Sequence, residues 1–332
     1  MAGIRIGGSG VLVRVGVPYS YGPSNYNIEI TDPSGGGAHT DVTAPGTASV
    51  QTPVMNHAGT LMTYLKLNAG DYNMRSVAPD GSGDTLVRSG SVRYSDWSPD
   101  DSQIVFTVYD TGDEDTVRIM DADGSNESVL YTAGSGLEVM RPCFNFDGTK
   151  IAFMEQTSGF TGKIRCMNAD GSGAADVVTG IRYTPDNAFS WAYSSNVIAY
   201  GDGQTNGKFR KINSDGTGGT DLETQLNSLN AYGTRHMWAP DDSAIYPEIY
   251  QGSTRWKIYE SPAAGGGGAA LSPVFQVVDR PTFVLDGRVY GLTYIEPAPS
   301  SGTNFSSCAL DGSDRRVEDT APAADILLEL FA

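Results

Sequence analysis

One sequence motif recurs along the whole chain, and it limits the possible folds more than any other feature. It consists of a large apolar residue, a tight turn, and a short apolar strand, seen most clearly in residues 97–106 and again in residues 144–153. The residues that close this turn are Gly10, Gly59, Asp101, Gly148, Ser195, Asp242 and Gly287. Their successive separations, by subtraction, are 49, 42, 47, 47, 47 and 45 residues. The chain is therefore a repeat protein with seven units.

A second marker follows the first in every unit. It is a glycine 21 to 25 residues later, at positions Gly35, Gly81, Gly124, Gly171, Gly216, Gly265 and Gly312. Aspartate precedes it in five of the seven turns, which predicts hairpins, because Gly accepts a positive φ and Asp can bond to its own backbone. A unit of this length with several short strands predicts a β-propeller blade of four antiparallel strands, named here A to D from the inside outward.

We therefore predict an all-β chain that forms one seven-bladed β-propeller. The expected blades are residues 1–43, 44–87, 88–131, 132–179, 180–222, 223–271 and 272–318. Six blades after an N-terminal extension is the alternative, because the first unit is degenerate. The tail, residues 319–332, carries an apolar run where another A strand would begin. We expect this run to pair with the first blade and close the ring, the alternative being a segment that docks on a partner.

Large apolar residues stand four positions before each turn-closing residue. They are Ile6, Met55, Trp97, Phe144, Trp191, Trp238 and Phe283. Both faces of a blade pack against neighbouring blades, so we expect this column to fill the contacts between blades rather than to form an exposed platform. The three cysteines, Cys143, Cys166 and Cys308, lack the spacing of metal ligands and are interpreted as buried free thiols.

The sequence motif of the repeat resembles that of a known family. An aromatic residue followed by Ser-Pro-Asp at 97–100, Ile-Ala-Phe at 151–153 and Met-Asp-Ala-Asp-Gly-Ser at 120–125 are similar to the WD40-like repeat of TolB-type β-propellers. The resemblance covers residues 50–318, and residues 1–43 fit it weakly. TolB itself is a periplasmic partner-binding protein with a further domain before a six-bladed propeller. The resemblance implies the blade and does not extend to TolB's role.

Charge and hydropathy narrow the function classes. The formal net charge is −17, which argues against nucleic acid as a partner, because phosphate backbones are bound by basic surfaces. No apolar run is long enough to cross a bilayer, so we expect no membrane insertion. The N-terminus has no basic segment followed by an apolar core, which predicts a protein that is cytoplasmic or associated with a virion.

Motifs for catalysis are missing from the sequence. It contains no Gly-x-Ser-x-Gly elbow and no Walker-type loop. The three histidines, His39, His57 and His236, fall in different parts of the blade and are not expected to meet around a metal. We therefore expect no catalytic residues, no cofactor and no enzyme activity.

Aspartates mark two kinds of turn that we expect on one face of the propeller. The A–B turns contain Asp100, Asp101, Asp147, Asp241, Asp242 and Asp286, and the C–D turns contain Asp80, Asp123, Asp170, Asp215 and Asp311. Either they serve the turns themselves, or the acidic face docks a basic partner or divalent cations. A separate acidic loop carries Asp110, Asp113 and Asp115, which is either a weak Ca²⁺ candidate or a solvated loop.

Two further columns are candidates for recognition and for blade contacts. Aromatic residues lie in or beside the B–C and D–A loops, which suits binding of a protein or a glycan on a rigid scaffold; they are Tyr72, Tyr109, Phe160, Tyr183, Tyr232, Tyr250 and Tyr294. Arginines stand six residues before four consecutive C–D glycines: Arg75, Arg118, Arg165 and Arg210. We expect each of these arginines to bridge to a neighbouring blade.

These features favour a non-enzymatic interaction or assembly module with a protein partner. The Gly-, Ser-, Thr- and Tyr-rich, Lys-poor composition suggests a bacteriophage virion, as a tail or host-attachment protein, by compositional analogy. A carbohydrate-active lyase or hydrolase working at the central channel is one alternative. A TolB-like envelope protein that binds a partner is the other.

Overall fold

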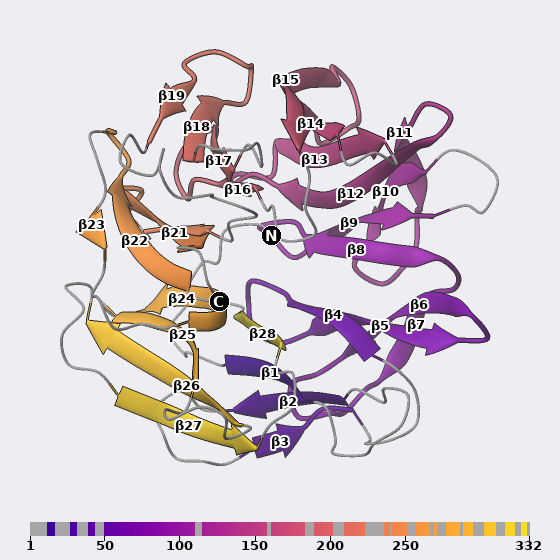
Figure 1. Cartoon of the computed structure of the whole chain (residues 1–332). Coiled ribbons are helices and arrows are strands. Elements are labelled where there is room, and N and C mark those ends of the chain that lie inside the picture. Colours follow the sequence, from indigo (N-terminus) through magenta and orange to yellow (C-terminus); the bar gives the residue numbers. More distant parts are fainter. Residues whose placement is uncertain are drawn as a thin grey trace. The chain divides into compact units, whose positions relative to one another are not determined.

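The structure is a computed structural model that describes seventeen stretches of the chain. They are residues 12–16, 27–31, 39–43, 50–109, 115–157, 161–182, 189–201, 209–222, 236–239, 241–250, 256–265, 269–270, 277–285, 288–294, 302–309, 316–322 and 327–330. Every helix or strand assigned in these stretches is a strand, so the all-β prediction is confirmed. The strands form antiparallel sheets, most of them four-stranded (Figure 1).

Consecutive strands build the second, third and fourth sheets. The second contains β4 (Val50–Met55), β5 (Met62–Asn68), β6 (Asp71–Val77) and β7 (Thr85–Arg88). The third contains β8 (Val92–Trp97), β9 (Gln103–Val108), β10 (Thr116–Asp121) and β11 (Ser128–Thr132). The fourth contains β12 (Leu137–Phe144), β13 (Lys150–Thr157), β14 (Thr161–Asn168) and β15 (Ala175–Arg182). In each sheet the four strands follow one another in space as they do along the chain, as the A-to-D assignment expects.

The fifth sheet and the last one follow the same plan. The fifth contains β16 (Phe189–Trp191), β17 (Val197–Gly201), β18 (Phe209–Asn213) and β19 (Thr220–Asp221). The last joins β20 (His236–Trp238), β21 (Ala244–Tyr250), β22 (Trp256–Pro262) and β23 (Ala269–Ala270) to β24 (Val277–Leu285), β25 (Arg288–Tyr294), β26 (Gly302–Ala309) and β27 (Arg316–Pro322). The two groups of four meet through a single residue pair, Trp256 with Val277.

The two ends of the chain share the first sheet. Its order is β28 (Leu327–Leu330), β1 (Leu12–Gly16), β2 (Asn27–Thr31) and β3 (His39–Asp41). Strand β28 runs antiparallel to β1, with Leu330 opposite Leu12 and Leu327 opposite Val15. The apolar tail therefore takes the place of an A strand beside the N-terminal strands, which is the pairing expected from the repeat spacing.

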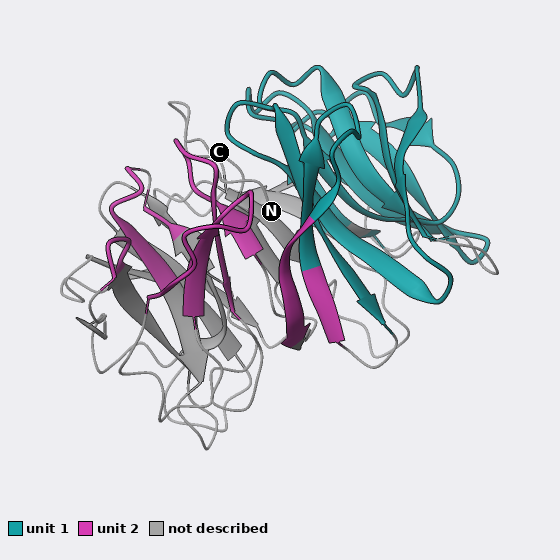
Figure 2. Cartoon of the chain, turned by 90° about the horizontal axis from the view of Figure 1, so that it is seen from above, with its two compact units in different colours: residues 1–159, 164–175, 324–332 teal, residues 160–163, 176–323 magenta. Residues whose placement is uncertain are grey.

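The chain divides into two compact units, coloured separately in Figure 2. Unit 1 comprises residues 1–159, 164–175 and 324–332, and unit 2 comprises residues 160–163 and 176–323. Each is described by itself below.

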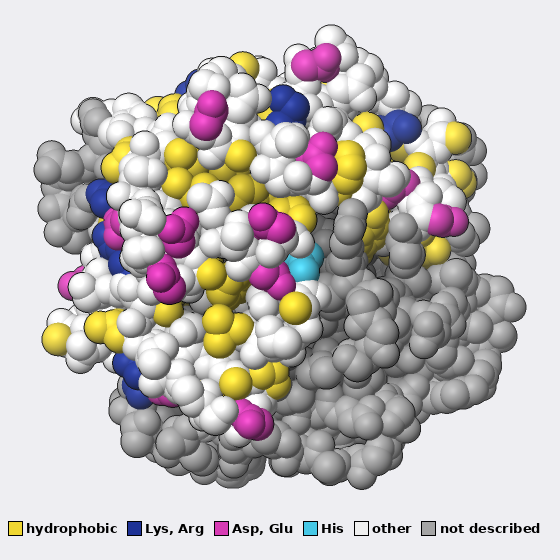
Figure 3. Space-filling view, turned by 180° about the vertical axis from the view of Figure 1, so that it is seen from behind, with side chains coloured by type: hydrophobic (Ala, Val, Ile, Leu, Met, Phe, Trp, Pro, Cys, Tyr) yellow, Lys and Arg dark blue, Asp and Glu magenta, His cyan; other side chains and the backbone are white. Residues whose placement is uncertain are grey.

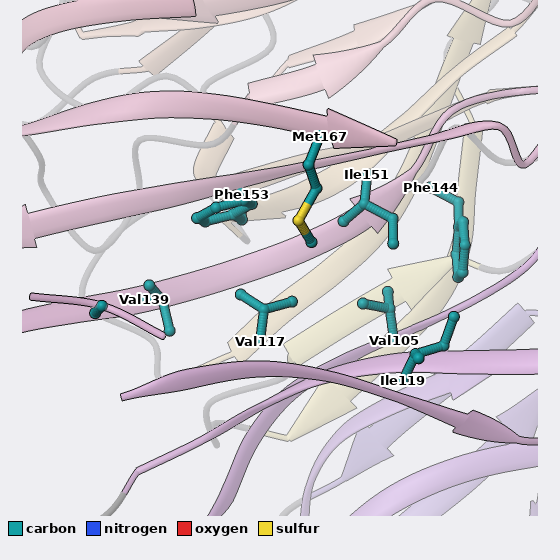
Figure 4. Packing of buried hydrophobic residues seen from close by; sticks show 9 residues of the cluster. Val105, Val117, Ile119, Val139, Phe144, Ile151, Phe153 and Met167 are labelled. Carbon is teal, nitrogen blue, oxygen red and sulfur yellow. The ribbon is translucent and has the colours of Figure 1, made fainter. Parts of the chain in front are cut away.

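Apolar side chains from neighbouring sheets interlock in unit 1. In β9 every residue from Ile104 to Val108 is buried, so both faces of that sheet are covered. Figure 4 shows Val105 and Val117 of the third sheet pointing toward Phe153 and Met167 of the fourth. Burial on both parities explains why these strands read as continuous apolar runs instead of alternating ones.

In the column of large residues before the A–B turns, the five side chains that the structure describes are buried, as predicted. Trp97 and Trp191 are each 1% exposed, and Trp238 is 4% exposed. The indole N–H of Trp97 donates to the carbonyl of Val54 at 3.1 Å, and that of Trp238 donates to the carbonyl of Ser190 at 3.4 Å. These tryptophans therefore tie each A strand to the A strand of the preceding sheet. Cys143 and Cys166 are buried free thiols, and Cys308 lies in β26.

Three A strands of unit 1, β4, β8 and β12, carry bulges. The register shifts between Gln51 and Val54 in β4, and between Met140 and Cys143 in β12. Thr52 and Arg141, inside these two bulges, have φ of 45° and 50°. Pro53 and Pro142 follow them, and proline is tolerated there because a bulge leaves its residue outside the hydrogen-bond ladder.

Candidate functional site

Most of the turn aspartates whose bonds are resolved serve their own turns. In the C–D turns, Asp80, Asp123, Asp170 and Asp215 each accept the N–H and the hydroxyl of the Ser or Thr two residues later. In the A–B turns, Asp100, Asp147 and Asp241 do the same. The serine hydrogen bonds hold the pKa of Asp80, Asp123 and Asp170 below the usual range.

The two kinds of turn lie side by side, as expected for one face. The N–H of Ala122 in a C–D turn donates to the carbonyl of Ser102 in the A–B turn of the same sheet, at 2.9 Å. Ala169 with Thr149, and Ala263 with Ser243, repeat this bond. Figure 3 shows one face of the molecule, on which acidic side chains are spread among apolar and neutral ones. The hydrogen bonds within the turns explain why aspartate recurs there: its carboxylate stabilises the turn itself.

Two aspartates instead connect neighbouring sheets. Asp101, at φ 60°, accepts the N–H of His57 at 2.7 Å and the N–H of Ala58 at 2.8 Å, both in the preceding A–B turn. Its carboxylate also lies 3.2 Å from Nδ1 of His57. In unit 2, Asp242 binds the N–H groups of Tyr193 and Ser194 in the same way. We call Asp101 and Asp242 the latch aspartates.

The expectation that the arginine column bridges between blades is wrong for the pairs that the structure gives. Arg75 pairs with Asp84 at 2.8 Å, Arg118 with Glu127 at 2.8 Å, and Arg210 with Asp221 at 2.8 Å. Each carboxylate follows the C–D turn of the same sheet. It therefore lies within reach of the guanidinium on the adjacent C strand. The bridge between sheets is made from the other side, because Glu127 also pairs with Arg88 of β7.

Arg165 departs from this pattern and touches two sheets. It lies 3.3 Å from Glu155, which is only 2% exposed, and donates to the hydroxyl of Tyr131 at 2.5 Å. Tyr131 in turn donates its hydroxyl to Glu155. Burial, followed by the bond to Glu155, raises the pKa of Tyr131 to about 12. The buried carboxylate is thus held by a guanidinium and a phenol.

A second buried carboxyl lies between two A strands of unit 1. Asp96 of β8 is 5% exposed, and its Oδ2 accepts the N–H of Phe144 in β12 at 2.9 Å. Burial raises the pKa of Asp96 to about 6. The repeat pattern does not mark Asp96, because the repeated column of large residues falls on its neighbour, Trp97.

Of the three aspartates that form the weak Ca²⁺ candidate, the structure describes Asp115, which is buried. Asp115, the residue before β10, is 4% exposed, and its Oδ2 accepts the N–H of Val139 at 3.3 Å. Asp110 and Asp113 lie outside the described residues. Across the part of the chain that the structure describes, no three His, Cys, Asp or Glu side chains come together as a metal site.

The predicted partner-binding aromatics are described unevenly. Tyr72 and Tyr109 are half-buried beside the B–C loops of the second and third sheets, and Tyr72 packs against the core that includes Trp97. Tyr250 and Tyr294 end strands β21 and β25. Phe160, Tyr183 and Tyr232 lie outside the described residues.

The loop ends around Tyr109 are tied together by hydrogen bonds. The N–H of Tyr109 donates to the carbonyl of Ser91 at 2.9 Å, and the hydroxyl of Ser91 donates to Asp71 at 3.1 Å. The N–H of Gly90 donates to the side-chain carbonyl of Asn73 at 2.7 Å. Arg93 of β8 places its guanidinium 4.0 Å from the centre of the Tyr109 ring. We call Asp71, Tyr72, Ser91, Arg93 and Tyr109 the loop-side surface; sequence reasoning found its tyrosines and missed its arginine.

Within the described ranges, no helix combines the length and the apolar character needed to cross a membrane.

Comparisons with known proteins identify the fold. No protein-family model and no curated protein sequence matches the chain. TolB from Acinetobacter baumannii superposes with a TM-score of 0.53 at 14% identity, over 96% of this chain and 82% of that one. An oligogalacturonate lyase in complex with manganese superposes with a TM-score of 0.61 at 14% identity, over 96% and 86%.

A structure from an analysis of two prolyl endopeptidases gives a TM-score of 0.68 at 8% identity. It covers 97% of this chain, which spans 50% of that protein's length. These neighbours differ in activity and agree in architecture, so the likeness concerns the fold. The chain has the β-propeller fold of four-stranded antiparallel sheets that is found in TolB, in oligogalacturonate lyases and in prolyl oligopeptidases.

Proposed function

We propose that this chain is a seven-bladed β-propeller that works as a non-enzymatic interaction module and binds a protein partner through its loop-side surface. The observation that carries the proposal is the set of bonds that holds Tyr109 and its neighbours. Tyrosine and arginine dominate protein-binding hot spots, and here both are fixed before any partner arrives.

The sheet pattern supports seven blades. In the described parts of the chain, strands β1 to β28 divide into five four-stranded sheets and one of eight strands. The eight-stranded sheet is joined at its middle by the pair Trp256–Val277 alone, so it divides naturally into β20–β23 and β24–β27. Seven groups of four then agree with the seven pairs of turn markers in the sequence.

A binding role rather than catalysis is supported by what the carboxylates do. Seven of the turn aspartates that the structure describes accept hydrogen bonds from the Ser or Thr of their own turn, and the latch aspartates accept N–H groups of the preceding turn. The buried Glu155 is held by Tyr131 and Arg165. General acid–base catalysis requires carboxyls that can reach a substrate, and these are engaged in holding the fold.

Assembly into a larger particle, such as a virion, is the setting that the composition favours. Gradient sedimentation of the protein from its own source, followed by mass spectrometry, tests this directly. We expect the chain to sediment with its partner in fixed stoichiometry. Sedimentation as a free monomer of 35.2 kDa would contradict the assembly role.

The surface itself is tested by mutation. Tyr109→Ala should weaken capture of the partner about tenfold or more, as expected for a hot-spot aromatic. Leu86→Ala is the matched control, because Leu86 is 54% exposed on the outer strand β7 and belongs to no loop. Equal capture by wild type and Tyr109→Ala would place the binding surface elsewhere.

A further inference from the structure

The loop-side surface contains a guanidinium, that of Arg93, which donates no hydrogen bond to any of the residues that the structure describes. Arg93 is half-buried, and its guanidinium lies 4.0 Å from the centre of the Tyr109 ring. Among the described residues it has no carboxylate, carbonyl or hydroxyl acceptor. Stacking uses the face of a guanidinium and leaves the N–H groups at its edge pointing outward.

Five other arginines among the described residues have ion-pair partners. Arg75, Arg88, Arg118, Arg165 and Arg210 each have a carboxylate partner in the structure. Carboxylates outnumber cations in this chain, with 39 Asp and Glu against 22 Lys and Arg. As far as the described residues go, the planar fork of Arg93 remains available to a group from outside the chain.

The backbone holds Arg93 in this position. The register of β8 against β9 shifts between Val92 and Ser95, so Arg93 and Tyr94 lie in a bulge, and Ser91 just before it has φ 49°. Bulges re-aim side chains and are over-represented beside functional sites. The bond from the Tyr109 N–H to the Ser91 carbonyl fixes the ring to the same bulge. Ring and guanidinium are therefore positioned together.

We propose that Arg93, held on Tyr109, receives a carboxylate of the protein partner. This inference rests on the proposed function and names the chemistry of its central contact. A guanidinium edge matches two carboxylate oxygens, and such charge-assisted pairs are the strongest hydrogen bonds in proteins. Because the whole chain carries a net charge of −17, the partner is neutral or basic overall and presents its Asp or Glu side chain only at this point.

The first test uses a small probe on the full chain. N-acetyl-glutamate is titrated while the Arg93 Nε–H resonance is followed by NMR, with N-acetyl-glutamine as the neutral control. We expect saturable shifts from the glutamate and none from the glutamine. The backbone N–H resonance of Tyr109, which every variant keeps, reports binding in the variants. Arg93→Gln should abolish the shift of this resonance, and Arg93→Lys should weaken binding about tenfold or more, because lysine keeps the charge and loses the fork.

The matched control variant is Arg75→Gln. Arg75 is paired with Asp84, so its removal should leave the Arg93 response unchanged. Absence of any shift at Arg93, or equal shifts with the two probes, would overturn the proposal. Binding of N-acetyl-glutamate that persists in Arg93→Gln would also overturn it.

The second test separates this inference from the proposed function. Capture of the native partner is compared for wild type, Arg93→Gln and Tyr109→Ala, after thermal unfolding has shown that all three are folded. Loss of capture in both variants supports the carboxylate contact. Loss in Tyr109→Ala alone keeps the surface and refutes the role of Arg93. Full capture by both variants refutes the surface itself. Binding of an acidic oligosaccharide in place of a protein would refute the protein partner.

Discussion

The turn glycines illustrate how one atom matters at the residue scale. Gly124 has φ 88°, and a Cβ there would lie 2.7 Å from the carbonyl oxygen of Val87 in the preceding sheet. Gly171 repeats this with φ 83° and a distance of 2.9 Å to the carbonyl of Leu130. A backbone oxygen cannot swing away as a side chain can. We expect Gly124→Ala to lower the free energy of unfolding by about 2–4 kcal/mol, from strain at positive φ plus the clash.

Gly83 provides the matched control for this prediction. Its φ is 69°, but a Cβ would meet no atom within 4 Å. Gly83→Ala should therefore cost only the strain term, about 1 kcal/mol. Urea unfolding of both variants measures the difference. Equal losses would mean that the contact with Val87 does not matter and that the glycine column reflects backbone conformation alone.

The buried Asp96 makes stability depend on pH in a direction opposite to the turn aspartates. Burial raises its folded pKa to about 6, above the unfolded value near 4. The folded state therefore binds the proton more tightly, and stability is lost as pH rises from about 4 to about 6. Asp96→Asn should remove this loss, which amounts to ~2–3 kcal/mol between pH 4 and pH 7.

Chemical unfolding of wild type and Asp96→Asn across pH 4 to 8 isolates this effect. The depressed pKa values of Asp80, Asp123 and Asp170 contribute stability that is lost only as pH falls below about 4, and both proteins share them. A difference between the two proteins that is flat with pH would show that Asp96 ionises as easily in the folded state as in the unfolded state.

Turn residues could be predicted from the sequence because their chemistry is local. An Asp two residues before a Ser or Thr bonds to that residue whatever the rest of the fold does, as Asp123 does with Ser125. Asp96 and Arg93 could not be predicted in this way. Their partners, Phe144 and Tyr109, are chosen by the packing of sheets and by a bulge, which the repeat pattern does not encode.

At the scale of elements, the latch aspartates join one A–B turn to the next. Asp101 accepts hydrogen bonds from the N–H groups of residues 57 and 58 in the preceding A–B turn. The equivalent position in the fourth sheet is Gly148, also at positive φ. Asp101→Gly should therefore keep the turn and lose the link, at a cost of about 1–3 kcal/mol.

A graded series makes this prediction sharper. Asn tolerates positive φ and keeps one acceptor oxygen, so Asp101→Asn should fall between wild type and Asp101→Gly. Thermal unfolding gives the order, and amide hydrogen exchange at His57 and Ala58 reports the link itself. If exchange at these two amides is the same in all three proteins, the latch does not hold the preceding turn.

The strands could be predicted where the sequence follows the repeat closely, and less well where one sheet differs from the others. The pattern located the hairpins, yet β15 ends at Arg182 and β27 at Pro322, beyond the expected blade boundaries at 179 and 318. The outer strands lengthen because their pairing continues for as long as the C strand lasts. Bulges in β4 and β12 are marked by Pro53 and Pro142, whereas the bulge in β8 contains Arg93 and Tyr94 and no proline, so it has no sequence signal.

At the scale of the whole molecule, the pairing of β28 with β1 joins strands more distant along the sequence than any other strand pair of the described residues. Spacing of the repeat was enough to predict it, because the last run of apolar residues stands where an A strand belongs. The binding surface could not be derived in the same way. A repeat specifies what the units have in common, and recognition depends on what one unit has alone, such as Arg93 opposite Tyr109.

Removal of residues 324–332 tests what this pairing contributes. The first sheet would then have an unpaired edge at β1, where residues 12–15 now face residues 327–330. Exposure of an edge strand and loss of four ladder pairs should lower the midpoint of thermal unfolding and promote association between copies. A synthetic peptide of residues 324–332 should restore the midpoint when added in excess, and a peptide with Leu328→Asp and Leu330→Asp should not. If the shortened chain unfolds at the same temperature as the full one, the contact is dispensable and the tail is free to serve a partner instead.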